Sequence, residues 1–130
     1  MRTKQRWLLL MSLLVSNALW AATSTEMLNG YATAAGAKGQ PDKGQAFFNT
    51  IHGKEWSCSS CHTKQPTGEG LHASTRKVIS PLAPAANEKR FTDSAKTEKW
   101  FRRNCNDVLG RECSNAEKAD VLSWLMTLNP

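Results

Sequence analysis

Residues 58–62 have the sequence Cys58-Ser59-Ser60-Cys61-His62, and this short run constrains the interpretation of the whole chain. On one helical turn, two thiols at this spacing reach the two vinyl groups of one haem, and the histidine that follows presents its imidazole to the iron. The motif therefore predicts one covalently attached haem c, held by Cys58, Cys61 and His62.

Two other kinds of site also use closely spaced cysteines. A redox-active C-x-x-C pair normally precedes a helix in a β-α-β unit, and no segment of this sequence shows the two-residue alternation of a strand. A zinc site needs a second close pair of ligands, whereas Cys105 and Cys113 are eight positions apart. The sequence favours haem over both alternatives.

The first 21 residues are predicted to be a secretory signal peptide. Basic residues at positions 2, 4 and 6 precede an apolar run over residues 7–15, and small residues follow up to Ala22. That run is too short to cross a bilayer, which takes about 20 residues. We expect cleavage after Ala21 and one periplasmic domain, residues 22–130, without a membrane anchor. The alternative is an uncleaved N-terminal anchor.

The charge of the chain is lower after the predicted cleavage. Removal of residues 1–21 takes the Lys plus Arg count from 17 to 14 against 11 acidic residues, so the formal charge falls from +6 to +3. No tract combines clustered basic residues with aromatic ones, so a nucleic-acid partner is not expected. Export would place the four cysteines in an oxidising compartment, where a disulfide persists.

Helical patterns dominate the N-terminal half of the predicted domain. One helix is expected over residues 25–35, and another over residues 42–49 with Ala46 and Phe47 facing inward. Proline and glycine recur through residues 63–92, which predicts a long loop with little regular structure.

Two further helices are expected near the C-terminus. The first covers residues 93–109 and ends at Gly110, because glycine readily adopts the left-handed conformation of a C-cap. The second begins at Ser114, which forms a capping-box pattern with Glu117. The predicted fold class is all-α.

Asn104 interrupts the apolar stripe of the first of these helices. The stripe has the spacing i, i+3, i+4, i+7, and a buried amide without a hydrogen-bond partner costs about 1–3 kcal/mol. One interpretation is a core asparagine bonded to the backbone or to a haem propionate. The other is a distal iron ligand, because an amide oxygen is a weak, hard donor that suits ferric iron better than ferrous iron. The stripe consists of Phe101, Asn104, Cys105 and Val108.

A simple electron carrier would need another second axial ligand. Such cytochromes usually take a methionine downstream of the motif, but none occurs between residues 62 and 124. Met27 and Met126 fall in segments that resemble core, so packing roles are expected for them. His52 and His72 remain, either as ligands or as exposed loop histidines.

Several segments together resemble one known family. Residues 100–113 have the sequence WFRRNCNDVLGREC, and residues 30–32, 90–93 and 117–122 fit the same pattern. On these motifs the chain resembles the sphaeroides haem protein family of oxygen-binding monohaem cytochromes c. Residues 63–80 match this family least well, so no property is transferred to them.

The resemblance implies a class I cytochrome c-like fold around one haem. It implies that His62 and Asn104 hold the iron in the oxidised state, and that reduction frees Asn104 and leaves a site for O2, NO or CO. It also implies a disulfide between Cys105 and Cys113. A dihaem or other cytochrome c is the implied electron donor.

Three functions remain open at this point. The protein is a gas-binding redox protein, a simple electron carrier with a second strong ligand, or a haem enzyme that converts NO or O2. The third function needs a proton source, for which Asn104 is the best candidate. Lys99, Arg102 and Arg103 lie opposite the apolar stripe, where they form either a solvated face or a docking patch for an acidic cytochrome.

Overall fold

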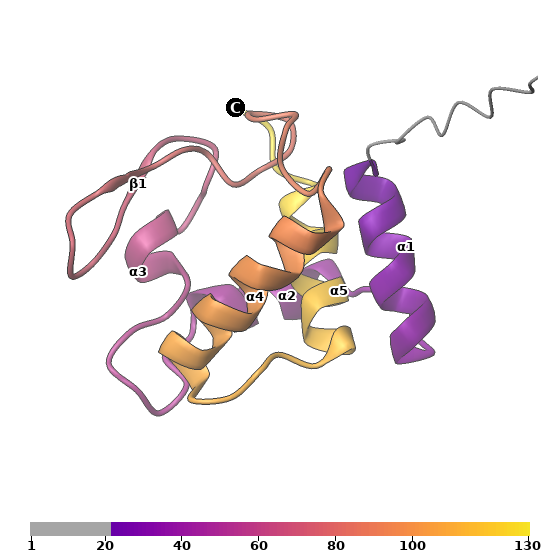
Figure 1. Ribbon diagram of the computed structural model, residues 1–130, viewed down its shortest axis with the longest axis horizontal. Coiled ribbons are helices and arrows are strands. Elements are labelled where there is room, and N and C mark those ends of the chain that lie inside the picture. The colour runs from indigo at the N-terminus through magenta and orange to yellow at the C-terminus, as the bar shows by residue number, and fades with distance from the viewer. Residues whose placement is uncertain (1–21) are drawn as a thin grey trace, which may run out of the picture.

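The computed structural model describes residues 22–130, and the predicted signal peptide, residues 1–21, lies outside the described residues. The described part is mostly helical, with one small antiparallel pair of strands (Figure 1). The expectation of an all-α, class I cytochrome c-like fold is confirmed. The elements are α1 (Ser24–Ala35), α2 (Pro41–Asn49), α3 (Ser59–His62), β1 (Gly70–Leu71), β2 (Val78–Ile79), α4 (Ser94–Leu109) and α5 (Asn115–Leu125).

Helix α5 is the centre of the hydrophobic core. Leu122 and Leu125 are fully buried on it. One side of α5 packs with Tyr31 of α1, and the other side packs with Phe48 of α2. Because α1 and α2 come from the start of residues 22–130 and α5 from their end, the core joins both ends of this described segment.

The inward face of α2 differs from the predicted one. Ala46 is exposed and Phe47 is partly buried, whereas Gly44 and Phe48 are fully buried. Gly44 lies directly against the backbone of Asp120 in α5, where a β-carbon would collide with the carbonyl oxygen. This close approach sets the rotation of α2 about its axis, so the prediction that Ala46 faces inward was wrong.

Residues 63–92 form a loop as expected, apart from one short hairpin. Strands β1 and β2 pair with Gly70 opposite Ile79. The hairpin rests on α3: Gly70 lies against the carbonyl of Cys61, and the backbone N–H of Ala73 donates to Cys61 Sγ at 3.3 Å. This loop therefore forms one wall beside the C-x-x-C-H turn.

Helix α4 begins and ends as its sequence predicts. The Asp93 side chain caps it by accepting a hydrogen bond from the Lys96 backbone at 2.9 Å, and Gly110 ends it in the left-handed conformation with φ of 72°. Helix α5 carries the predicted capping box between Ser114 and Glu117. Within residues 22–130, no helix is both long and apolar enough to span a membrane.

Candidate haem-binding site

The α3 turn brings the three predicted attachment residues together. Cys58 occupies the N-cap position, and the backbone N–H of His62 donates to its carbonyl oxygen at 3.1 Å. Ser60 Oγ accepts a hydrogen bond from the Ser57 backbone at 3.0 Å, which fixes the entry to the turn. Both thiols are free and partly buried, so the turn offers two thiols and one imidazole from a single short segment. That donor set fits a covalently attached haem.

The cysteines do not have the environment of a redox-active pair. Burial raises the pKa of the Cys58 thiol to about 11, and the neighbouring Cys61 adds to this rise. A reactive thiol instead has a lowered pKa, because the thiolate is the nucleophile. The α3 turn also follows a loop rather than a strand. Both observations argue against the C-x-x-C redox alternative.

His62 is held in its neutral form. Removal of the imidazole from water, with smaller contributions from Arg90 and His72, lowers its pKa to about 4. The ring lies near Phe48, with 6.1 Å between ring centroids. A neutral imidazole with a free lone pair is the form that binds iron.

Arg90 is a residue of this site whose role the sequence analysis did not identify. Its partly buried guanidinium donates from Nε to the carbonyl of Pro81 at 2.9 Å and from Nη2 to that of Ser80 at 2.6 Å. The guanidinium thereby places a fixed positive charge near His62. Arg90 belongs to one of the segments that resemble the known family, and that was the only signal in the sequence.

Asn104 lies partly buried in the middle of α4, on the face that also carries buried Cys105 and Val108. Its side-chain amide makes no hydrogen bond to another of residues 22–130, and its polar atoms are not among the fully buried unpaired ones, which are Tyr31 Oη and Asn49 Oδ1. By contrast, the exposed Asn106 amide donates to the carbonyl of Arg102 at 2.8 Å. The Asn104 amide is therefore not fixed by another of the described residues, and it stays accessible to solvent.

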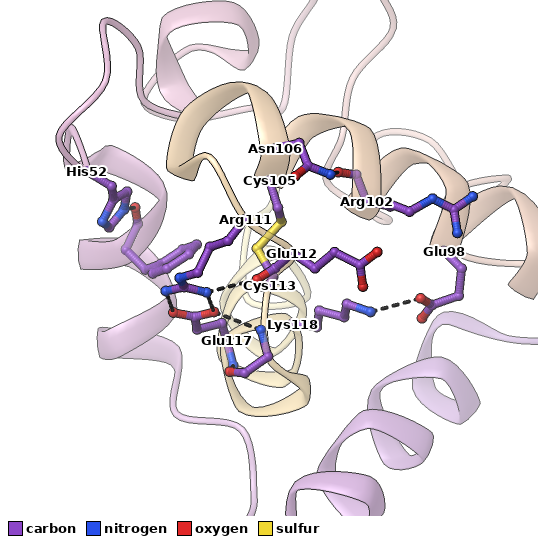
Figure 2. The surroundings of a disulfide bond; sticks show 12 residues. His52, Glu98, Arg102, Cys105, Asn106, Arg111, Glu112, Cys113, Glu117 and Lys118 are labelled. Carbon is purple, nitrogen blue, oxygen red and sulfur yellow. Dashed lines mark hydrogen bonds and ion pairs between the residues drawn. A yellow bond between two sulfur atoms is a disulfide. The ribbon is translucent and has the colours of Figure 1, made fainter.

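The disulfide between Cys105 and Cys113 is present, as expected (Figure 2). It joins α4, immediately after Asn104, to the segment that leads into α5. Arg111 reinforces the same corner by donating two hydrogen bonds to the Glu117 carboxylate, at 2.9 and 2.7 Å. Together these contacts hold the C-terminal end of α4.

The alternative ligands are placed less favourably. His52 Nε2 lies 2.7 Å from the carbonyl oxygen of Phe47, so that nitrogen already has a partner. His72 Nδ1 accepts a hydrogen bond from the Thr75 backbone at 3.2 Å, which leaves its Nε2 as the only candidate atom. Met27 and Met126 pack against the core cluster around Leu122, which agrees with the packing roles expected for them.

The predicted basic face of α4 is exposed, and it includes one large aromatic side chain. Lys99, Arg102 and Arg103 all face solvent. Trp100 is 43% exposed between two of these cations, with Lys99 Nζ 5.9 Å and the Arg103 guanidinium carbon 5.1 Å from its ring centroid. We call these four residues the α4 basic patch.

Comparisons with known proteins give consistent results. The profile of a family described as a domain of unknown function (DUF1924) matches residues 34–125. The cytochrome c-type protein SHP of Cereibacter sphaeroides is 46% identical over 125 residues, which cover 92% of this chain and 96% of that protein. Cytochrome c'' of Methylophilus methylotrophus is 49% identical over 88 residues, which cover 65% of this chain and 61% of that protein.

Solved structures agree with these relationships. Oxidised SHP, described as an oxygen-binding cytochrome c, matches with a TM-score of 0.77 at 44% identity, over 82% of this chain and 98% of that one. Oxidised cytochrome c'' from Methylophilus methylotrophus matches with a TM-score of 0.74 at 38% identity, over 82% and 95% of the two chains. The chain therefore belongs to the DUF1924 family and, within it, to the sphaeroides haem protein group of c-type cytochromes with one covalently bound haem.

Proposed function

We propose that this protein is an exported, periplasmic cytochrome c whose iron is held by His62 and, in the oxidised state only, by Asn104. Cys58 and Cys61 form the two thioether bonds to the haem. On reduction Asn104 would leave the iron, which would then be open to O2, NO or CO. The observation that carries this proposal is the position of Asn104, whose partly buried side chain lies on the same face of α4 as buried Cys105 and Val108 and makes no hydrogen bond to another described residue.

The two proposed ligands differ in strength. His62 is a neutral imidazole at physiological pH, because burial and nearby positive charge lower its pKa to about 4. The Asn104 amide oxygen is a weak, hard donor that favours ferric over ferrous iron. When bound, haem would supply a one-electron iron centre, which His62 and Asn104 would hold. The weaker ligand is the one that leaves on reduction.

Asn104 has a second use after it leaves the iron. Its amide carries two N–H donors as well as the oxygen, so the same side chain is able to donate a hydrogen bond to a diatomic ligand. Val108, one turn further along α4, is buried and apolar, so it helps to exclude water from this side. This arrangement favours binding of a small gas over water.

The relatives support both parts of the proposal. Oxidised SHP is described as oxygen-binding, and a solution structure of cytochrome c'' is described as giving insight into haem-ligand detachment. That solution structure matches this chain with a TM-score of 0.69 at 39% identity, over 80% of this chain and 92% of that one.

We further propose that the electron donor is an acidic cytochrome c, such as a dihaem cytochrome, that docks on the α4 basic patch. The patch combines three exposed cations with an exposed indole, on the same helix as Asn104. Attraction between opposite charges speeds encounter and is screened by salt. The rate of reduction by such a donor should therefore fall as ionic strength rises, and fall further for Arg103→Gln. A rate independent of salt would exclude this docking site.

Absorption spectra of the ferric and ferrous holoprotein, with and without CO, test the ligand exchange. We expect a high-spin ferrous form that shifts on addition of CO. Asn104→Ala should change the ferric spectrum as well, because it removes the sixth ligand. Asn106→Ala is the matched control, since Asn106 lies on the exposed side of the same helix.

A low-spin ferrous form that does not respond to CO would contradict the proposal. It would indicate a second strong ligand, with His72 as the first candidate because its Nε2 has no hydrogen-bond partner among residues 22–130. His72→Gln would then free the iron, and the protein would be a simple electron carrier.

A further inference from the structure

Lys118 of α5 is an unusually buried charged residue, with only 8% of its surface exposed. Its Nζ donates to Glu98 Oε2 of α4 at 2.8 Å. Figure 2 shows this pair as a dashed line on the far side of the disulfide from Arg111 and Glu117. Lysine is almost never so buried without a partner, so the contact with Glu98 is needed to hold its charge.

Aromatic rings complete the surroundings of the ammonium group. Lys118 Nζ lies 5.3 Å from the ring centroid of Tyr31 in α1 and 5.8 Å from that of Phe101 in α4. These two rings meet edge to face, with 5.7 Å between their centroids. A cation above aromatic faces is attracted by them, more strongly when it is removed from water. Lys118 therefore joins α1, α4 and α5 at one point.

The surroundings of Glu98 favour its carboxylate form. Partial burial raises the pKa of Glu98, but the hydrogen bond from Lys118 and the nearby Tyr31 lower it by more, so the net direction is downward. The pKa of the Tyr31 hydroxyl is raised, mainly because the side chain is buried and to a smaller extent because the Glu98 carboxylate is close. Tyr31 Oη itself makes no hydrogen bond of ordinary geometry among the described residues. Lys118 is thus the principal partner of Glu98.

The position of this contact along α4 relates it to Asn104. Glu98 lies six residues before Asn104, and Phe101 lies three residues before it, which places Phe101 and Asn104 on neighbouring positions of one face. The disulfide of Cys105 holds the helix on the other side of Asn104. The segment that carries the proposed ligand is therefore tied to α5 before Asn104, and to the segment that leads into α5 after it.

We propose that Lys118 is a positioning residue, which holds α4 through Glu98 and Phe101 where Asn104 reaches the ferric iron. This inference rests on the proposed function, because it concerns the strength of the Asn104 bond. Loss of Lys118 loosens α4 before Asn104 and weakens that bond. Because Asn104 stabilises the ferric state, a weaker bond raises the reduction potential and makes the ferric iron more accessible to an added ligand.

The test uses the holoprotein and imidazole as an added ferric ligand that competes with Asn104. Lys118→Met should bind imidazole roughly fivefold more tightly than the wild type, the lower end of a typical coupling between sites. Its reduction potential should rise, and Lys118→Arg should restore both properties in part. Lys96→Met is the matched control, because Lys96 is an exposed lysine of the same α4 helix.

A second variant covers the outcome in which Lys118→Met does not fold. Glu98→Gln removes the same ion pair by changing its more exposed partner. The Glu98 side chain is 46% exposed. This variant should shift imidazole affinity and potential in the same direction. Unchanged affinity and potential in a folded Lys118→Met, or in Glu98→Gln, would overturn the positioning role.

The Asn104→Ala background separates this inference from the proposed function. If Lys118 acts through Asn104, Lys118→Met should add no further gain in imidazole affinity in that background. An equal gain in both backgrounds would overturn the positioning role while leaving Asn104 as the ligand. If Asn104→Ala alone left the ferric spectrum unchanged, the proposed function itself would fail, and the inference with it.

Discussion

Helices α4 and α5 lie next to each other in sequence, yet they are held in place by different means. Helix α5 is buried over most of its length and packs against both α1 and α2. Helix α4 buries only Thr97, Cys105 and Val108, and it is held at specific points by a disulfide and an ion pair. Close packing makes a rigid core, whereas a few specific ties leave the residues between them room to adjust. Asn104, the proposed ligand, lies on α4, which is the less closely packed of the two helices.

The largest expected effect is a loss of stability from a substitution in the closely packed helix α5. Leu122→Ala removes a fully buried side chain of α5, and it should lower the free energy of unfolding by about 3 kcal/mol through lost burial and a residual cavity. Urea unfolding followed by circular dichroism measures this loss. Val78→Ala, at a position that is 63% exposed, is the control and should change little. A loss of less than 1 kcal/mol for Leu122→Ala would contradict the central role of α5.

Removal of the disulfide should affect both stability and the iron. Cys105→Ser with Cys113→Ser opens a short loop, which costs about 2–3 kcal/mol in the chain-entropy account. Because Cys105 follows Asn104 directly, we also expect the ferric spectrum to move toward that of Asn104→Ala. Leu122→Ala should leave the ferric spectrum unaltered. An unaltered ferric spectrum in the disulfide variant would show that the tie after Asn104 is not needed for ligation.

The two helix caps offer a matched pair of smaller changes. Ser114→Ala and Asp93→Ala each remove a side chain that accepts a hydrogen bond in the first turn, from Glu117 N at 3.1 Å and from Lys96 N at 2.9 Å. Each should cost about 1 kcal/mol. Hydrogen exchange should show global destabilisation for Ser114→Ala and local opening of α4 for Asp93→Ala. The same pattern in both variants would remove the distinction between the helices.

The smallest effect concerns the exposed pair at the corner between α4 and α5. The hydrogen bonds from Arg111 lower the pKa of Glu117 below its ordinary value of 4.5, although partial burial opposes this. A lowered carboxyl pKa stabilises the fold above pH 4.5, and that contribution is lost as the pH falls through the lowered value. Arg111→Gln should therefore lower the urea midpoint slightly at pH 7 and by less at pH 3. An equal change at both pH values would exclude this linkage.

The elements predicted best depend on neighbours in the sequence. The end of α4 at Gly110, the capping box at Ser114 and the α3 turn all occur as expected, because their hydrogen bonds join residues within one turn. The hairpin at residues 70–79 was missed, since Gly70 owes its place to contact with Cys61 rather than to a strand pattern. The predicted inward face of α2 was wrong at Ala46 for a similar reason, because the contact of Gly44 with α5 sets which face turns inward.

The sequence alone determined the attachment motif, the family and the residue types at the site. Cys58, Cys61 and His62 follow one another within a turn, so no distant contact is needed to recognise them. Tertiary structure alone decided that Lys118 meets Glu98, that Arg90 lies near His62, and that the Asn104 amide has no partner within residues 22–130. These features depend on how helices distant in the chain approach one another, because burial and charge pairing are properties of the packed molecule.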